Sequence, residues 1–114
     1  NSAAGHHLDN LIVFVDKNGW QSGGSIEETI GSNNIKDRFE AFGWDAQEID
    51  GHNIEEIQKA ISNAKNVKGK PSVIVCACTK GKGIPYMENN NAWHKGVPTQ
   101  EQYEEARKVL GGVL

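Results

Sequence analysis

The sequence predicts an α/β fold with three layers, in which helices flank a mostly parallel sheet. Two observations carry this prediction. Residues 11–15 and 72–78 are apolar without alternation, which is typical of strands covered on both faces. Helical periodicity lies between and after these runs, and the order strand, helix, strand, helix, strand, loop, helix indicates a doubly wound sheet with right-handed crossovers.

The first strand is expected over residues 11–17, and it stops abruptly in a polar turn. A helix is expected over residues 35–42, with Asn34 as its N-cap and Gly43 at its end. The apolar residues that share one face of this helix are Ile35, Phe39 and Phe42. We expect that face to pack on the sheet.

The second strand is expected over residues 44–50, before the turn Asp50-Gly51. The clearest helix of the chain follows it. Asn53 caps this helix with Glu56 three residues on, as in a capping box. Its expected apolar stripe consists of Ile54, Ile57, Ile61 and Ala64. The spacing predicts that this stripe covers one face of the sheet.

The third strand is expected over residues 72–78 and carries both cysteines, Cys76 and Cys78. Residues two apart on a strand share a face, which is poor disulfide geometry. We therefore expect a reduced, cytosolic thiol pair that serves as buried apolar filler.

A long polar segment without periodicity follows this strand, and the chain then forms a last helix. Thr99 and Gln102 have the spacing of a capping box, and Gly111 is expected to end the helix. The residues expected on its apolar side are Tyr103, Ala106 and Leu110.

Length and composition indicate one globular domain over residues 1–114, since 37% of the residues are hydrophobic and 24% are charged. The net charge of −3 gives no general attraction to nucleic acid or to an anionic membrane. No apolar run reaches the length of a membrane span, and the first ten residues lack a signal-peptide pattern. These features favour a cytoplasmic protein.

Polar groups of a parallel sheet gather beyond the carboxyl ends of its strands, and "DKNGWQ" (16–21) follows the first strand. Asn18 offers an amide oxygen, and neighbouring carbonyls offer more, so this turn suits Mg²⁺ together with a diphosphate. Asn-Gly is also an ordinary turn dipeptide. The spacing alone leaves both interpretations open, with the simple turn favoured.

The segment after the third strand contains "KGKG" (80–83) and His94. Glycines permit close approach to a phosphate and the lysines supply charge, but the run does not match a P-loop, and a solvated basic turn explains it equally well. His94 lies beside Trp93 in a loop long enough to suggest function. A surface loop histidine is the alternative.

Four blocks change this balance: "LDNLIVFVDKNGWQ", "FEAFGWDAQEIDGHNIEEIQKAI", "GKPSVIVCACTKGKGI" and "MENNNAWHKGVP". Taken together, they closely resemble the thiamine-diphosphate-binding domain of transketolase. The likeness spans nearly the whole chain and is strongest with transketolases whose N-terminal half is a separate subunit.

The resemblance implies a role for four residues. Asn18 would bind Mg²⁺ through its side chain, and Trp20 would bind it through its backbone carbonyl. Lys80 would lie near the bound cofactor, and His94 would be catalytic. The implied reaction transfers a two-carbon ketol unit between sugar phosphates with thiamine diphosphate and Mg²⁺ as cofactors.

The sequence departs from the family pattern in one major respect. The family's metal site begins with Gly-Asp-Gly, one strand–helix unit before the asparagine, and this sequence contains no Gly-Asp-Gly. The thiamine-diphosphate fold is therefore expected to be incomplete at its N-terminus, covering only the C-terminal part of the domain. The pyrimidine-binding domain would come from another subunit or region, in a dimeric or higher assembly.

Because one amide and one carbonyl cannot hold Mg²⁺ against water, the chain alone is expected to be inactive. Two alternatives remain. One is another thiamine enzyme, of the deoxyxylulose-phosphate synthase or 2-oxoacid dehydrogenase type, although "AWHKG" (92–96) favours transketolase. The other is a non-catalytic α/β association module.

Overall fold

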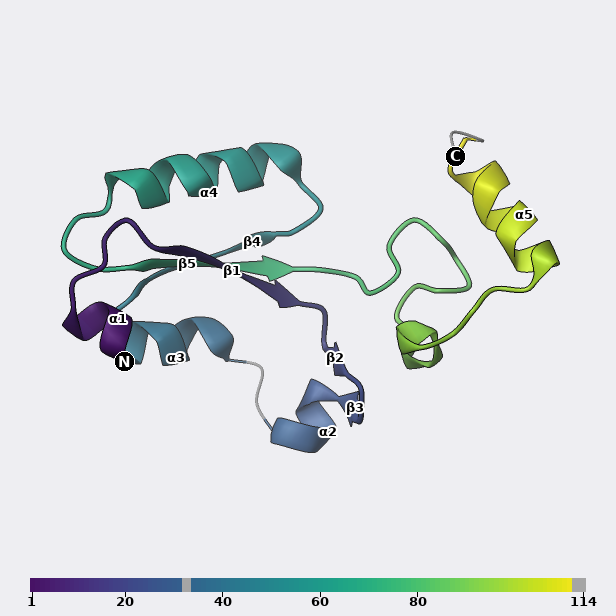
Figure 1. The fold of residues 1–114 in the computed structure, drawn as a ribbon, viewed down its shortest axis with the longest axis horizontal. Coiled ribbons are helices and arrows are strands. Elements are labelled where there is room, and N and C mark those ends of the chain that lie inside the picture. Colours follow the sequence, from purple (N-terminus) through teal and green to yellow (C-terminus); the bar gives the residue numbers. More distant parts are fainter. Residues whose placement is uncertain (32–33, 112–114) are drawn as a thin grey trace. The chain divides into compact units, whose positions relative to one another are not determined.

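The structure is a computed structural model that describes residues 1–31 and 34–111 (Figure 1). The chain forms two compact units, which are described separately. The sheet unit contains residues 1–18 and the described residues up to 78, and the loop unit contains residues 19–31 and the described residues from 79 onward. The prediction of a single domain stays a prediction.

The sheet unit is built on three parallel strands in the order β1 (Ile12–Lys17), β5 (Ser72–Ala77) and β4 (Asp45–Asp50). In this register Lys17 lies opposite Ala77, and Ala77 lies opposite Asp50. The carboxyl ends of the strands therefore meet at one edge. This confirms the predicted parallel sheet, with strand bounds within one residue of those expected.

Helices lie on both sides of this sheet (Figure 1). Helices α3 (Ile35–Ala41) and α4 (Ile54–Asn66) each contact β4 and β5, and a short helix α1 (Ser2–Gly5) precedes β1. Three consecutive side chains of β5, Val73, Ile74 and Val75, are fully buried. Because side chains alternate along a strand, both faces of β5 must be covered, as predicted.

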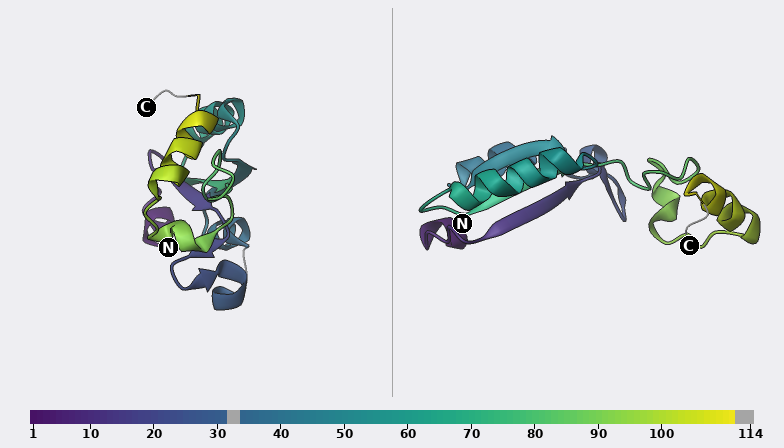
Figure 2. Two further views of the ribbon diagram at one scale, coloured as in Figure 1. Left: turned by 90° about the vertical axis from the view of Figure 1, so that its right-hand side faces the viewer. Right: turned by 90° about the horizontal axis from the view of Figure 1, so that it is seen from above.

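Strand β1 differs from the prediction that both its faces are covered. Phe14 is 49% exposed, although it lies in the middle of the apolar run. The reason is position: among the described residues β1 pairs only with β5 and lies along the margin of the sheet (Figure 2), while α3 and α4 pack on β4 and β5. The apolar run thus predicts the strand correctly but not its coverage.

The predicted cap of α4 is present, since the Asn53 Oδ1 atom accepts hydrogen bonds from the Glu55 and Glu56 amides at 3.0 and 3.2 Å. The predicted apolar stripe needs one correction. Ile54 is 65% exposed because it is the first residue of the helix, and Ala60 is buried instead. The core cluster on this face consists of Ala60, Ala64, Ile74 and Cys76.

The loop unit contains short elements: β2 (Trp20–Gln21), β3 (Gly24–Ser25), α2 (Ile26–Ile30), the 3₁₀ helix η1 (Asn91–His94) and α5 (Gln100–Val109). Both hydrogen bonds of the predicted capping box at Thr99 and Gln102 are formed. Of the side chains expected to line one face of α5, Ala106 is buried, whereas Tyr103 and Leu110 are more than two-fifths exposed. No helix in the described part of the chain is long and apolar enough to cross a membrane.

Candidate functional site: the carboxyl end of the sheet and the loop unit

The first site region is the edge where the three strands end. The Cys78 amide donates to the Lys17 carbonyl at 3.1 Å, and the Gly51 amide donates to the Ala77 carbonyl at 2.9 Å. These bonds continue the sheet one residue beyond each strand. Asn18 is the next residue after Lys17, so the predicted metal ligand stands directly on a hydrogen-bonded strand end.

One face of this edge carries an ion pair between the outer strands. The Lys17 Nζ atom lies 2.6 Å from the Glu48 Oε1 atom, and the two side chains are 19% and 37% exposed. Strand β5 lies between β1 and β4, so the pair reaches across the central strand. Such a pair is a charge-assisted hydrogen bond as well as a Coulombic contact.

The opposite face of the edge carries Asp16 and the two thiols, because Asp16 and Cys76 are register partners. Burial raises the pKa of Cys76, and the Asp16 carboxylate adds to this. Burial raises the pKa of Cys78 to about 11, with further contributions from the charge of Asp16 and a hydrogen bond to it. Both cysteines are free, and both stay protonated at neutral pH.

Gly51 explains why a glycine follows Asp50 at this edge. A Cβ atom at Gly51 would overlap the Cys78 Sγ atom and would lie 2.9 Å from the Cys76 Cβ atom. The Cys78 thiol therefore occupies the space that a side chain at position 51 would need. Cys76 is buried filler, as predicted, whereas Cys78 is half-buried and bonded to a carboxylate.

Asn18 leads into a tight turn. Gly19 has φ +78°, a conformation that favours glycine, and its carbonyl accepts a hydrogen bond from the Ile26 amide at 2.9 Å. Trp20 follows in β2, where it pairs with Ser25. The turn geometry agrees with both interpretations of Asn18, as a turn residue and as a metal ligand, because each requires the strand to end here.

The "KGKG" turn is folded back on the segment that follows it. A Cβ atom at Gly81, where φ is +72°, would lie 2.5 Å from the Met87 carbonyl oxygen. The Gly83 amide donates to the Glu88 Oε1 atom at 3.0 Å, and the Lys80 carbonyl accepts from the Asn89 amide at 2.9 Å. This basic turn is therefore a structured loop, and the Lys80 side chain is half-buried within the loop unit.

His94 ends the short helix η1, which its neighbours hold in place. The Asn90 Oδ1 atom caps η1 at the Ala92 amide, 3.1 Å away. The Trp93 indole donates to the Tyr86 carbonyl at 2.9 Å, and the two rings lie 5.2 Å apart. The His94 side chain itself is exposed. The sequence thus places an accessible imidazole on a braced turn.

The structure brings Lys80 and His94 into one unit, with Trp20, while Asn18 belongs to the sheet unit. Their functional roles stay predictions. Sequence reasoning missed two contacts of the strand edge, the Lys17–Glu48 pair and the Cys78–Asp16 bond. No local signal could have found the ion pair, because it depends on the strand order.

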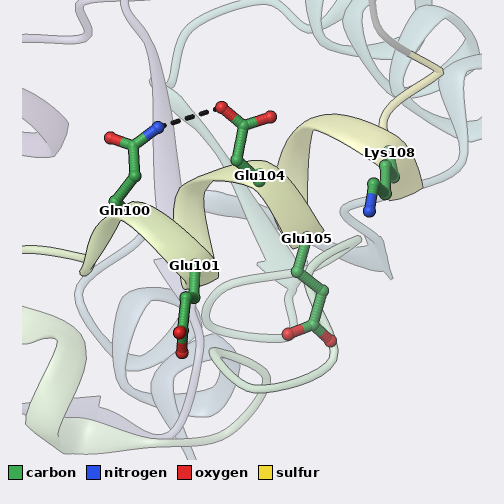
Figure 3. A pocket seen from close by; sticks show the side chains of 5 residues that line it. All are labelled: Gln100, Glu101, Glu104, Glu105 and Lys108. Carbon is green, nitrogen blue, oxygen red and sulfur yellow. Dashed lines mark hydrogen bonds between the residues drawn. The ribbon is translucent and has the colours of Figure 1, made fainter.

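Three surface hollows of about 360, 500 and 410 Å³ occur in the described part of the chain. The first lies along α5 and is lined by Gln100, Glu101, Glu104, Glu105 and Lys108 (Figure 3). There Gln100 donates to Glu104, while Glu101 and Glu105 extend to one side. None of the three hollows is lined by Asn18, Trp20, Lys80 or His94. Within residues 1–31 and 34–111, no group of three or more His, Cys, Asp or Glu side chains could hold a metal.

Comparison with known proteins identifies the family. The family described as "Transketolase, thiamine diphosphate binding domain" matches residues 1–112. One of the two subunits of an apulose-4-phosphate transketolase from Phocaeicola vulgatus is 43% identical over 101 residues, which is 89% of this chain and 36% of that protein. The 6-deoxy-6-sulfo-D-fructose transketolase subunit SqwG of a Clostridium species is 41% identical over 104 residues, 91% of this chain and 38% of that protein.

Solved structures agree with this. The transketolase of Campylobacter jejuni matches with a TM-score of 0.86 and 35% identity, over 96% of this chain and 17% of that one. A Pichia stipitis transketolase in complex with sedoheptulose-7-phosphate matches with a TM-score of 0.88 and 27% identity, over 96% of this chain and 16% of that one. The chain therefore spans little more than a third of the related subunits and about a sixth of these whole enzymes. It belongs to the transketolase family and corresponds to part of its thiamine-diphosphate-binding domain.

Proposed function

We propose that this chain supplies part of the thiamine diphosphate site of a transketolase, which transfers a two-carbon ketol unit between sugar phosphates. The observation that carries the proposal is the family match over residues 1–112. The name of one relative and the bound ligand of one solved structure are sugar phosphates, and the name of another relative is that of a sulfo-sugar transketolase. An anionic sugar is therefore the expected substrate class.

The residues present suit Mg²⁺ in kind. The Asn18 amide oxygen and the Trp20 carbonyl are hard neutral oxygen donors, and they follow a strand end whose last main-chain groups are held by β5. They do not suffice in number, because Mg²⁺ takes six ligands and prefers phosphate and carboxylate oxygens. We assign the remaining ligands to the cofactor's diphosphate and to a carboxylate from another part of the enzyme.

The loop unit supplies the groups that act on the substrate side. Lys80 would place its cation near the bound cofactor, on a loop fixed by the Lys80–Asn89 main-chain bond. His94 would exchange a proton with a hydroxyl of the sugar, or donate a hydrogen bond where negative charge develops. When bound, thiamine diphosphate supplies the electron sink that ketol transfer requires.

The assembly follows from the relatives' names. Two of them are subunits of transketolases, which supports a second polypeptide that carries the pyrimidine-binding domain, in a dimer or larger complex. The chain alone lacks the carboxylate that the metal site needs. We therefore expect that thiamine diphosphate and Mg²⁺ give no measurable turnover with these 114 residues alone.

The test uses the complete enzyme, with the preceding part of the polypeptide and the partner polypeptide. A panel of ketose donors and aldose acceptors, both phosphorylated and sulfonated, should show ketol transfer. Substitution of Asn18 by Ala should weaken Mg²⁺-dependent cofactor binding, whereas His94→Ala should lower kcat by about 10²-fold or more and leave cofactor affinity nearly unchanged. Equal loss of turnover and cofactor binding in His94→Ala would remove it from catalysis. Decarboxylation of 2-oxoacids without ketol transfer would show another thiamine enzyme.

A further inference from the structure

We propose that Lys17 and Glu48 are positioning residues: their ion pair fixes the strand end that carries Asn18 and so sets the affinity of the enzyme for Mg²⁺. This inference rests on the proposed function, because it requires Asn18 to be a metal ligand. Nothing in the local sequence singles out either residue. The inference comes from the order and register of the strands.

The pair differs from the other ion pairs of the described chain. Its N–O distance is 2.6 Å, against 3.5 Å for Lys36–Glu40 and 3.9 Å for Lys82–Glu88. The lysine side chain is 19% exposed in the first pair, 40% in the second and 55% in the third. Exposed pairs contribute little because water screens them, so Lys17–Glu48 is the pair in which geometry and partial burial favour a defined role.

The pair joins strands that do not otherwise meet. In the sheet, Lys17 is a register partner of Ala77, and Glu48 is a register partner of Val75. The lysine therefore reaches diagonally over the central strand, on the face where Ala77 leaves room because its side chain is small. The two outer strands are in this way tied directly to each other at the end where Asn18 follows.

This tie matters because β1 is otherwise weakly held. Among the described residues its only strand neighbour is β5, and Phe14 in its middle is 49% exposed. At its end, the Lys17 carbonyl accepts from the Cys78 amide, which fixes the main chain on one side only. The side-chain bond to Glu48 adds a second attachment, to β4, at the residue immediately before Asn18.

Metal affinity is sensitive to such support. Groups that orient a metal ligand without touching the metal typically change affinity by about 10–100-fold when they are removed. Without its partner, Lys17 would turn toward solvent, and the strand end would be free to shift relative to the other ligands. The effect should therefore appear in metal binding more than in the chemical step.

The experiment measures the complete, assembled enzyme. The variants are Lys17→Met, Glu48→Gln and the double variant, with Lys36→Met/Glu40→Gln as the matched control for loss of an ion pair in the same unit. Three quantities are recorded: the Mg²⁺ concentration that half-saturates thiamine diphosphate binding, by calorimetry; kcat at saturating Mg²⁺; and the thermal midpoint of the metal-free enzyme. Asn18→Ala is measured in parallel.

Each single variant should raise the half-saturating Mg²⁺ concentration by about tenfold, with kcat at saturating Mg²⁺ nearly unchanged. The double variant should be no worse than the singles, because both remove the same bond. Lys17→Arg, which keeps a cation, should recover most of the affinity. The Lys36→Met/Glu40→Gln control should leave Mg²⁺ affinity unchanged.

A lower thermal midpoint with unchanged Mg²⁺ affinity would show that the pair is merely structural and would overturn the inference. If Lys17→Met does not fold, Glu48→Gln decides, since it removes one charge and keeps the side-chain shape. A shift in Asn18→Ala but not in Glu48→Gln overturns this inference alone. No shift in either variant overturns the proposed function as well.

Discussion

The two units of the chain are stabilised by different physical means. The sheet unit rests on burial, with Val73, Ile74 and Val75 of β5 fully buried between helices. In the described part of the loop unit, Ala106 is the one buried apolar residue. Its stability comes instead from hydrogen bonds and close backbone contacts around Trp93 and Gly81.

This difference explains how site residues can be placed without a large core. Burial is non-directional, so it fixes the sheet but not the direction of a single side chain. Hydrogen bonds are directional, and the Trp93–Tyr86 and Tyr86–Gln102 bonds fix the turn before His94 at 2.9 and 2.8 Å. We expect the loop unit to open locally at a lower free energy than the sheet unit, because it buries less apolar surface.

The largest expected effect comes from Gly81→Ala. It combines a positive φ with overlap of the Met87 backbone, so the loop should lose roughly 2–5 kcal/mol of local stability. Gly69→Ala is the matched control, because Gly69 has the same φ of +72° but open space around it, and it should cost about 1–2 kcal/mol. Hydrogen exchange of residues 80–95 in the assembled enzyme measures the difference. Equal costs would mean that Met87 moves aside freely.

Gly51→Ala should cost about 1–3 kcal/mol through overlap with the Cys78 sulfur. This test asks whether the sheet unit also depends on a close contact. The double variant Gly51→Ala/Cys78→Ala should recover part of the loss, since the contact with the Cys76 Cβ atom remains. The measurement is urea unfolding followed by circular dichroism. Strict additivity of the two substitutions would contradict the assigned contact.

Trp93→Phe keeps an aromatic ring beside Tyr86 but removes the indole N–H group, so it should cost about 1 kcal/mol more than Trp44→Phe. Trp44 is a suitable control because it is also half-buried and packs against a ring, that of Phe39, at 5.1 Å. Hydrogen exchange at η1 and at β4 compares the two sites. A larger loss at Trp44 would reverse the proposed contrast between the units.

The smallest effect concerns the Cys78 thiol, whose raised pKa of about 11 favours the protonated form. Its contribution to stability is complete below the ordinary thiol value of 9.0 and is lost as pH rises through about 11. Asp16→Asn should lower this pKa, because it removes a nearby negative charge, while Asp45→Asn at the start of β4 should not. Ultraviolet absorbance of the thiolate gives the titration. An unchanged pKa in Asp16→Asn would contradict the Asp16–Cys78 bond.

Much of the sheet unit is predictable from sequence because its signals are long. The apolar runs of β1 and β5 and the caps of α4 and α5 each extend over several residues, and the structure contains all of them. The segment from β2 to α2 was missed because its elements have two to five residues, too few for periodicity. A signal was nevertheless present there, since Ser25 caps the Glu28 amide at 3.2 Å with the spacing of a capping box.

The candidate site was less predictable than the fold. An Asn-Gly turn at a strand end has the same backbone whether or not it binds metal, so resemblance to the family and not local pattern selected Asn18. The Lys17–Glu48 pair could not be predicted, because residues 31 positions apart meet only through the strand order. Glycine positions were visible in the sequence, but their reasons, such as the Gly81–Met87 contact, were not.

The contact between Gly51 and the Cys78 sulfur has a practical consequence for optical studies. A maleimide dye attached at this thiol would have to displace the bend that joins β4 to α4, because the sulfur already fills the space above it. Fluorescence from such a conjugate would report a distorted molecule. Spectroscopic probes for this chain therefore need an engineered attachment point, with the native thiol replaced by a residue of no greater volume.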